Sequence, residues 1–287
     1  MRIALLFLCL STSLFAQGFG QLPAFRAAGA IRPSSSVGNL NVDWYLTMTN
    51  GAIGTVVTAA IMTNGTLPVT SGLWSKTGTG KLHVGGHTNN LHSTVTVGGV
   101  TIPVNFANQS LCLSNTSANE FTTWEMDTSI ADRKMTIAGW VYLAVTNKAT
   151  GQPLFDLVSM QGESTGQSVV AQLQSGPSGT YVLEIESNPG GVTTHSSNIN
   201  VNPRTWYWLS LKGDYNTGVG QCSLYVYDTN FALVGSVTST NSVGENINPA
   251  MHLGQNEGGS GGNSSDIFCF EHIVGAHGAK AIQPLGP

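Results

Sequence analysis

Two short runs of aromatic and branched apolar residues, at positions 206–212 and 222–228, most constrain the fold of this chain. A polar, Gly-rich connection at positions 213–220 separates them, and this arrangement predicts an antiparallel hairpin. A third run, at positions 231–238, follows the sequence Asp-Thr-Asn at positions 228–230, whose side chains favour a tight turn.

The first run carries large side chains on both of its predicted faces. Successive side chains of a strand point to opposite faces, which gives one set of Tyr207, Leu209 and Leu211. The opposite set is Trp206, Trp208 and Ser210. This pattern is typical of a strand in a β-sandwich, with one face in the core and the other lining a concave surface or lying beneath loops.

The remainder of the chain also favours strands over helices. Before position 121, alternating or β-branched runs predict strands at positions 42–48, 54–62, 82–85 and 93–104. A Gly98-Gly99 pair interrupts the last run and predicts a hairpin there. Apolar stripes at helical spacing are almost absent, so we expect an all-β chain built as an antiparallel two-sheet jelly-roll sandwich.

The first 37 residues predict export rather than folded structure. Residues 1–16 have one basic residue, then a short apolar run and a small residue at Ala16, as in a secretory signal peptide. The apolar run is too short to span a bilayer, and we expect no membrane span elsewhere. Residues 17–37 predict a linker or irregular lead-in, and residues 38–280 a single sandwich domain. A separate small β module at residues 38–120 is the alternative.

Composition narrows the possible partners. Charged residues make up only 9% of the chain, against about 25% in an average domain. The net charge is −4, whereas nucleic acid and anionic membranes bind clustered Lys and Arg. We therefore expect neither partner, and we expect a secreted or extracellular protein, periplasmic if the source is bacterial.

Five segments resemble, in order, strands of a known family. Residues 135–143 and 153–157 are similar to its opening strands, residues 206–238 to its middle, and residues 251–254 and 266–273 to its closing pair. On this pattern, residues 121–275 resemble a laminin-G-like jelly roll of the concanavalin A-like lectin and glucanase superfamily. The resemblance implies a sandwich fold. Cys222 and Cys269 both lie in expected strands of this region and are the expected disulfide pair, three buried thiols with Cys112 being the alternative.

Carboxylates decide whether such a sandwich could cleave sugars. Acidic glucanases of the superfamily carry E-x-D-x-x-E on one strand, and Glu125 and Asp127 start like that motif, but Ile130 takes the place of the third acid. Retaining hydrolysis needs two carboxyl groups about 5–5.5 Å apart. We therefore expect no catalysis by this motif and interpret Glu125 and Asp127 as exposed strand positions.

Oxygen-bearing residues near the C-terminus predict a calcium site. Ca²⁺ takes six to eight oxygen ligands, and Asn256, Glu257 and Asp266 form the densest oxygen cluster, with a Gly/Ser-rich loop between them. Jelly rolls of the resembling family often hold such an ion at a sheet edge. Solvated loop acids are the alternative. His83, His87 and His92 are interpreted as surface or hairpin histidines, because Gly85-Gly86 interrupts any helical spacing of the first two, and a transition-metal site is the alternative.

Sugar binding uses flat aromatic faces together with neutral hydrogen-bonding groups. Candidates for such a platform are Trp140, Tyr142, Trp206, Trp208, Tyr225 and Tyr227. Together with the resemblance, they predict a non-catalytic glycan-binding or adhesive module, lectin-like and calcium-stabilised, whose partner is a polysaccharide or glycoprotein glycan. A glycoside hydrolase or polysaccharide lyase on the same fold, and a structural matrix protein that binds other proteins, are the alternatives.

Overall fold

A computed structural model describes the chain from position 43 onwards, with gaps. The described residues are 43–46, 52, 55–67, 74–78, 81–86, 93–97, 100–104, 109–114, 122–126, 134–144, 153–162, 168–175, 181–187, 194–195, 199–214, 221–239, 249–254, 267–278, 282 and 284. The predicted signal peptide at 1–16 and lead-in at 17–37 lie outside this part of the chain and stay predictions.

The larger of two main antiparallel sheets, sheet A, has nine strands. In spatial order its main path is β17 (Leu233–Thr238), β16 (Cys222–Tyr227), β15 (Trp206–Asp214), β9 (Lys134–Ala144), β19 (Ile267–His277), β1 (Trp44–Leu46) and β2 (Thr66–Leu67). The first half of β19 also pairs with β7 (Gln109–Ser114), and β7 pairs with β4 (Lys81–Gly86). The long strand β19 thus pairs with three strands from different parts of the chain, β1, β7 and β9.

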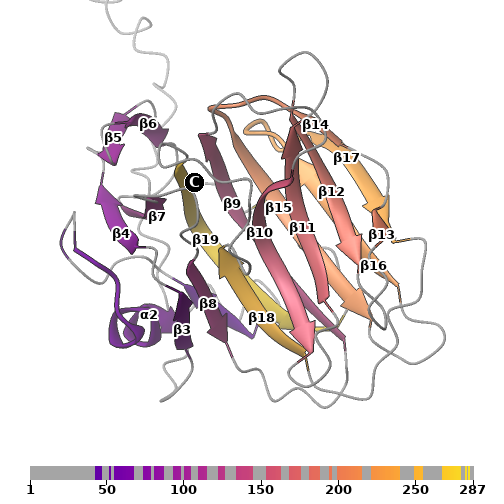
Figure 1. Ribbon diagram of the computed structural model, residues 1–287, viewed down its shortest axis with the longest axis horizontal. Coiled ribbons are helices and arrows are strands. Elements are labelled where there is room, and N and C mark those ends of the chain that lie inside the picture. Colours follow the sequence, from indigo (N-terminus) through magenta and orange to yellow (C-terminus); the bar gives the residue numbers. More distant parts are fainter. Residues whose placement is uncertain are drawn as a thin grey trace, which may run out of the picture.

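The second main sheet, sheet B, has eight strands. In spatial order these are β13 (Thr194–His195), β12 (Tyr181–Ser187), β11 (Ser168–Ser175), β10 (Pro153–Gly162), β18 (Pro249–Gly254), β8 (Thr122–Met126) and β3 (Trp74–Gly78), with β14 (Ile199–Val201) paired to β12. Figure 1 shows the two sheets as stacked layers, with β10, β11 and β12 in front of β15 and β16. The predicted all-β, two-sheet antiparallel sandwich is confirmed.

The hairpin at the centre of the sequence argument forms as predicted. Strands β15 and β16 pair antiparallel, and β16 pairs in turn with β17. In the turn before β17, Asp228 Oδ1 accepts hydrogen bonds from the backbone N–H groups of Asn230 at 2.8 Å and Ala232 at 2.9 Å. The aspartate side chain therefore builds the turn, as its residue type predicts.

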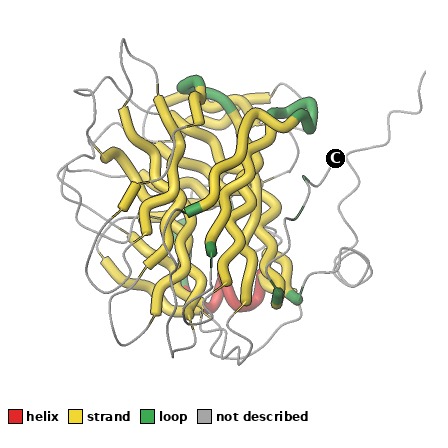
Figure 2. Tube along the Cα trace, turned by 90° about the vertical axis from the view of Figure 1, so that its right-hand side faces the viewer, coloured by secondary structure: helices red, strands yellow, loops and turns green. Residues whose placement is uncertain are grey.

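A side view shows that strand makes up nearly all of the described chain, with a helix at one end (Figure 2). This helix, α2 (Ala59–Gly65), corrects the predicted strand at positions 54–62. The Thr58 side chain accepts a hydrogen bond from the backbone N–H of Ile61, which caps the helix start. Two alanines follow the cap and favour the helix. The predicted hairpin at Gly98-Gly99 is confirmed by the pairing of β5 (Ser93–Val97) with β6 (Val100–Val104).

The main core fills the space between the two sheets. Sheet A contributes buried side chains that include Leu209 and Leu211, and sheet B contributes Leu183 and Leu253 among others. Near β1, the indoles of Trp44 and Trp74 meet edge to face with ring centroids 5.7 Å apart. A Cβ at Gly275, in β19 opposite Trp44, would lie 2.1 Å from an atom of the Trp44 indole. Glycine at this position thus lets the Trp44 indole pack directly against β19.

Strands from before position 121 enter both main sheets. Strands β1, β2, β4 and β7 belong to sheet A, and β3 belongs to sheet B. The N-terminal part of the described chain therefore shares sheets with the region that resembles the laminin-G pattern. The boundaries of a single domain at 38–280 stay a prediction.

Candidate functional site

The outer face of sheet A, which faces away from sheet B, carries a second apolar cluster. Alternation along β15 sends Leu209 into the core between the sheets and Trp208 to the outer face. We call the buried residues on that face the outer aromatic cluster: Tyr45, Cys112, Ala138, Trp140, Tyr142, Trp206, Trp208, Tyr227, Cys269, Val274 and Ala276. The prediction that β15 carries large side chains on two separate faces is confirmed.

Strand register places the six predicted platform aromatics side by side. Trp208 lies opposite Tyr227 on β16 and opposite Trp140 on β9, and Trp206 lies opposite Tyr142. The indoles of Trp140 and Trp208 have centroids 5.7 Å apart at 72°, an edge-to-face contact. The aromatics therefore form one contiguous patch over three neighbouring strands.

Most of this patch is covered. The exposed fractions are 0% for Trp140, 1% for Tyr142, 2% for Trp206, 0% for Trp208 and 6% for Tyr227, whereas Tyr225 is half-buried. Burial raises the pKa of the Tyr142 hydroxyl, while the nearby charge of Arg204 acts in the opposite direction. Ligand binding by the six aromatics stays a prediction, because a ligand could reach only Tyr225 without moving what covers the others.

Part of the cover comes from the chain beyond β19. Ile282 packs against the outer aromatic cluster. Its carbonyl oxygen accepts a hydrogen bond of 2.9 Å from Trp208 Nε1, and its backbone N–H donates one of 3.0 Å to Ser210 Oγ. Ile282 therefore satisfies two polar groups that β15 presents on its outer face.

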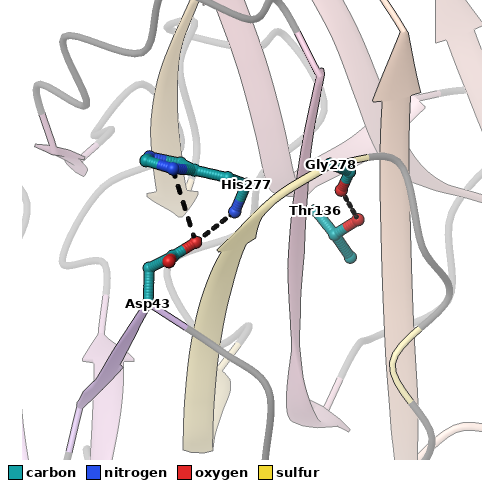
Figure 3. A network of polar contacts seen from close by, with 4 residues as sticks. All are labelled: Asp43, Thr136, His277 and Gly278. Carbon is teal, nitrogen blue, oxygen red and sulfur yellow. Dashed lines mark hydrogen bonds and ion pairs between the residues drawn. The ribbon is translucent and has the colours of Figure 1, made fainter. Parts of the chain in front are cut away.

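The chain leaves β19 through a small polar network (Figure 3). The Gly278 carbonyl oxygen accepts a hydrogen bond from Thr136 Oγ1 at 3.0 Å, and the Gly278 N–H donates to the Lys134 carbonyl at 2.7 Å. On the other side of β19, the Asp43 carboxylate accepts a hydrogen bond from the His277 backbone N–H. Gly278 has φ +88°, a left-handed conformation that glycine adopts without strain. These contacts set the direction in which the chain leaves the sheet.

Tyr45, Glu271 and His272 are buried polar residues that lie beside the outer aromatic cluster, at a bulge in β19. The register on β9 shifts between Glu271 and Val274, and His272 at the shift has φ +51°. Tyr45 Oη and His272 Nδ1 share a hydrogen bond of 2.9 Å. Burial, and secondarily the charge of Glu271, raises the pKa of the Tyr45 hydroxyl. The bulge thus brings β1 and β19 together through polar groups inside an otherwise apolar face.

The half-buried edge of the face lies on β16. The Lys212 ammonium lies 5.5 Å from the centre of the Tyr225 ring, within cation–π range. In register, Tyr225 is opposite Ser210, so it neighbours the position that Ile282 occupies. The Tyr225 ring and the Lys212 ammonium therefore meet at the accessible border of the outer aromatic cluster, beside the buried Ser210.

A disulfide joins Cys112 on β7 to Cys269 on β19, with a sequence separation of 157 residues. This corrects the predicted Cys222–Cys269 pair. Cys112 and Cys269 are directly opposed on neighbouring strands of the outer face, whereas Cys222 faces the core between the sheets. Cys222 keeps a free, buried thiol, and burial raises its pKa to about 12.

The predicted calcium ligands Asn256, Glu257 and Asp266 lie outside the described residues, so calcium binding stays a prediction. Within the described part of the chain, no group of three or more His, Cys, Asp or Glu side chains is placed to hold a metal ion. His83 lies on β4 opposite Cys112, and His87 and His92 fall outside the described residues. None of the helices described is both long and apolar enough to cross a membrane.

Glu125, the described residue of the candidate acid motif, belongs to sheet B. Glu125 on β8 pairs in register with His252 on β18 and with Ser75 on β3, while Asp127 and Ile130 lie outside the described residues. Strand β8 is in the other sheet, so the structure does not bring Glu125 to the outer face of sheet A.

Sequence reasoning did not find Tyr45, Glu271, His272 or Ile282. Tyr45 and His272 are 227 residues apart, and no local pattern links them. Ile282 lies beyond the last predicted strand in a stretch without alternation. The only available signal was the pair of charged or polar residues Glu271 and His272 inside an apolar run, which favours a bulge or a buried polar site.

No protein-family model and no curated protein matches this sequence. Among solved structures, a carbohydrate esterase from Shiga toxin-encoding bacteriophage phi24B is 11% identical over 71% of this chain and 90% of its own, with a TM-score of 0.44. The exoplasmic/lumenal domain of VIP36, in a Ca²⁺/Man3GlcNAc-bound form, is 10% identical over 74% and 88%, with a TM-score of 0.45. The CBM2 module of the evolved Dit of Lactobacillus casei BL23 phage J-1 is 8% identical over 68% and 88%, with a TM-score of 0.40. At these values the similarities carry no argument about what this chain binds.

Proposed function

We propose that this chain is an exported β-sandwich module that binds glycans without cleaving them, and that it binds them on the outer face of sheet A. The observation that supports this proposal is the outer aromatic cluster, which is separate from the core between the sheets. A two-sheet sandwich folds around one core between its sheets. A second apolar cluster of Trp and Tyr on the outer face is therefore not needed to pack the two sheets together. Aromatic rings with a few neutral polar groups are the lining that small-molecule sites use.

Chemistry at this face favours binding over cleavage. Sugar hydrolysis needs two carboxyl groups that flank the scissile bond. Glu125 of the candidate acid motif lies on a strand of the other sheet, and in the sequence Ile130 takes the place of the third acid. Glu271, on the outer face, is fully buried. At the accessible border, Tyr225 can stack on a sugar ring and Lys212 can donate hydrogen bonds, and neither residue is a carboxylate.

Export and calcium are parts of the same proposal. A disulfide between Cys112 and Cys269 is in keeping with an oxidising compartment, where such bonds persist. The predicted signal peptide at residues 1–16 supports the same location. Calcium held by Asn256, Glu257 and Asp266 would order the connection between β18 and β19 and so stabilise the strand that carries much of the outer face.

Exposed apolar residues favour a second candidate function, the binding of another protein. Phe231, Leu233 and Val234 expose 42%, 54% and 41% of their surface at the start of β17, the edge strand of sheet A. The sequence of β17 has no charged residue, and charges commonly protect edge strands from pairing. This observation supports a structural or adhesive role through protein contacts.

A glycan array with and without a calcium chelator tests the proposal. We expect saturable binding without release of reducing ends, and weaker binding by Tyr225→Ala but not by the exposed control Leu233→Ala. Release of reducing ends would show catalysis and overturn the non-catalytic function. If no glycan on the array binds, the protein-binding candidate is favoured. Loss of binding on chelation, restored by added Ca²⁺, tests the calcium site separately.

A further inference from the structure

Phe231, in the turn between β16 and β17, brings the outer aromatic cluster to the surface. Its ring lies beside that of Trp140, with ring centroids 6.0 Å apart at an interplanar angle of 55°. Trp140 is fully buried, whereas Phe231 keeps 42% of its surface exposed. One part of the Phe231 ring therefore packs on the cluster, and another part faces solvent.

The backbone at Phe231 adopts a conformation that its side chain disfavours. Its φ of +63° lies in the left-handed region, where the Cβ of a bulky residue crowds the backbone. Of the three described non-glycine residues with positive φ, Phe231 is the apolar one. Glycine would relieve this crowding, so the turn by itself does not explain an aromatic residue here. Residues held in such conformations cluster at ligand-binding sites.

The turn around Phe231 holds the ring in place before any ligand arrives. The Phe231 N–H donates to the Asp228 carbonyl at 3.0 Å, and the Asp228 N–H donates to the Ala232 carbonyl at 2.9 Å. Asp228 Oδ1 accepts from the N–H groups of Asn230 and Ala232. Because the backbone on both sides of the ring is fixed, a ligand that stacks on it loses little affinity to ordering of the protein.

A second accessible ring, Tyr225, borders the same face. Trp140, Trp208 and Tyr227 form one row across β9, β15 and β16. Tyr225 lies two residues before Tyr227 on β16 and so belongs to the next row. Two residues along a strand span about 7 Å. The Phe231 ring, beside Trp140, and the Tyr225 ring would therefore meet different parts of an elongated ligand.

Polar groups beside Tyr225 favour a saccharide over a protein as the partner. Ser236 is exposed and lies opposite Tyr225 on β17. The Lys212 ammonium lies 5.5 Å from the centre of the Tyr225 ring. A sugar can place its C–H face on an aromatic ring and form hydrogen bonds to such groups through its hydroxyls. Ser and Lys are depleted in the cores of protein interfaces.

We propose that Phe231 is a second stacking contact for the glycan, and that the site takes a saccharide of two or more units that reaches from Phe231 to Tyr225. The inference rests on the proposed function, because it names a further binding residue and the ligand length for the same face. The strained turn serves to present the Phe231 ring to the ligand.

The test begins with Phe231→Gly, which removes the ring and relieves the backbone at the same time. We expect oligosaccharide binding to weaken about tenfold. The free energy of unfolding should change little, because relief of the backbone offsets the lost contact with Trp140. Phe231→Tyr keeps a flat ring and should retain binding. Leu233→Ala is the matched control, an exposed apolar residue without a ring, and should bind as the unaltered chain does.

Isothermal titration measures binding of linear glucose and mannose oligosaccharides of one to six units, together with the strongest glycan of the array. In the unaltered chain, affinity should rise about tenfold once the saccharide is long enough to reach both rings, and Phe231→Gly should lose this gain. Phe231→Trp provides an independent readout. A bound oligosaccharide should protect the introduced indole from acrylamide quenching, measured against the unaltered chain.

The outcomes separate the inference from the function on which it rests. If Phe231→Gly binds every saccharide as the unaltered chain does, while Tyr225→Ala binds more weakly, the inference is overturned and the glycan function stands. Equal weakening by Phe231→Gly and Leu233→Ala also overturns it, because apolar area and not a ring would then matter. If the unaltered chain binds no saccharide, both fail. If Phe231→Gly loses its near-UV circular dichroism, Phe231→Trp decides: protection supports the inference, and its absence overturns it.

Discussion

The two faces of sheet A both carry fully buried side chains, but the residues on the two faces make different kinds of contact. Leu209 on the inner face and Trp208 on the outer face are both 0% exposed, although they are neighbours in the chain. Leu209 is surrounded by apolar side chains of both sheets. Trp208 has an indole N–H that needs a partner, and a backbone carbonyl from outside the sheet supplies it.

This difference teaches that burial alone does not identify a core. The inner face gains its stability from apolar area that needs no specific partner. The outer face mixes aromatic rings with Tyr45, Ser210, Glu271 and His272, whose polar atoms must be matched by hydrogen bonds. The following predictions compare how much the inner face, the outer face and the contacts around them contribute to stability.

The largest effect is expected on the inner face. Replacing Leu209 by alanine removes a fully buried side chain between the sheets and leaves a cavity. We expect a loss of about 2–5 kcal/mol in the free energy of unfolding, measured by chemical denaturation. Leu233→Ala, at a position 54% exposed, is the control and should change stability by less than about 0.5 kcal/mol. Equal losses at the two positions would contradict the assignment of the inner face.

Removing the disulfide should have the next largest effect. Cys112→Ala with Cys269→Ala opens a loop closed over a sequence separation of 157 residues. We expect a loss of about 2–4 kcal/mol in the free energy of unfolding, because the unfolded chain gains freedom.

Thiol counting provides the control for this pair. In protein without residues 1–16, and so without Cys9, the folded state should show no reactive thiol at pH 8, because burial raises the pKa of Cys222 to about 12 and keeps it protonated and covered. Unfolding in denaturant without reductant should reveal one thiol. Three thiols would show that the bridge is absent, and modification that maps to Cys112 instead of Cys222 would show that the pairing differs.

Breaking the buried polar contact on the outer face should have an intermediate effect. Tyr45→Phe keeps the ring but removes the hydroxyl that bonds His272 Nδ1. We expect a loss of about 1–3 kcal/mol, the cost of leaving a buried polar atom without this partner. The matched control is Tyr225→Phe at the half-buried border, where water can replace a lost contact. If Tyr45→Phe and Tyr225→Phe both lose little free energy of unfolding, the hydrogen bond between Tyr45 and His272 does not contribute to stability.

The smallest effect is expected at the turn that leads into β17. Asp228→Ala removes the acceptor for the backbone N–H groups of Asn230 and Ala232, at a solvent-exposed site. We expect a loss of about 1 kcal/mol in the free energy of unfolding. Asp228→Asn keeps the Oδ1 acceptor and should recover most of it. A full loss in the asparagine variant would show that the charge, and not the turn geometry, is responsible.

Local pattern predicted the parts of this molecule that depend on neighbours in the chain. The β15–β16 hairpin, the Asp228 turn and the separation of Leu209 from Trp208 follow from alternation and turn chemistry. Helix α2 was missed because its β-branched and apolar residues favour a strand, and the Thr58 cap decides otherwise.

Contacts between distant segments could not be predicted in the same way. The pairing of β7 with β19 decides which cysteine meets Cys269, and nothing near Cys112 in the sequence indicates it. The platform aromatics were identified as a set by residue type. Their contact with Ile282, and the contact between Tyr45 and His272, join segments of sheet A and its surroundings that are far apart in the sequence.

The covalent link between β7 and β19 also affects how the molecule would respond to proteases. Most of the polypeptide lies between its two half-cystines. A single cut anywhere in that interval leaves both fragments tethered, so a nicked molecule would migrate as one band on a gel without reductant and as two with it. Such a molecule would stay in one piece after a cleavage that separates an unlinked chain into two.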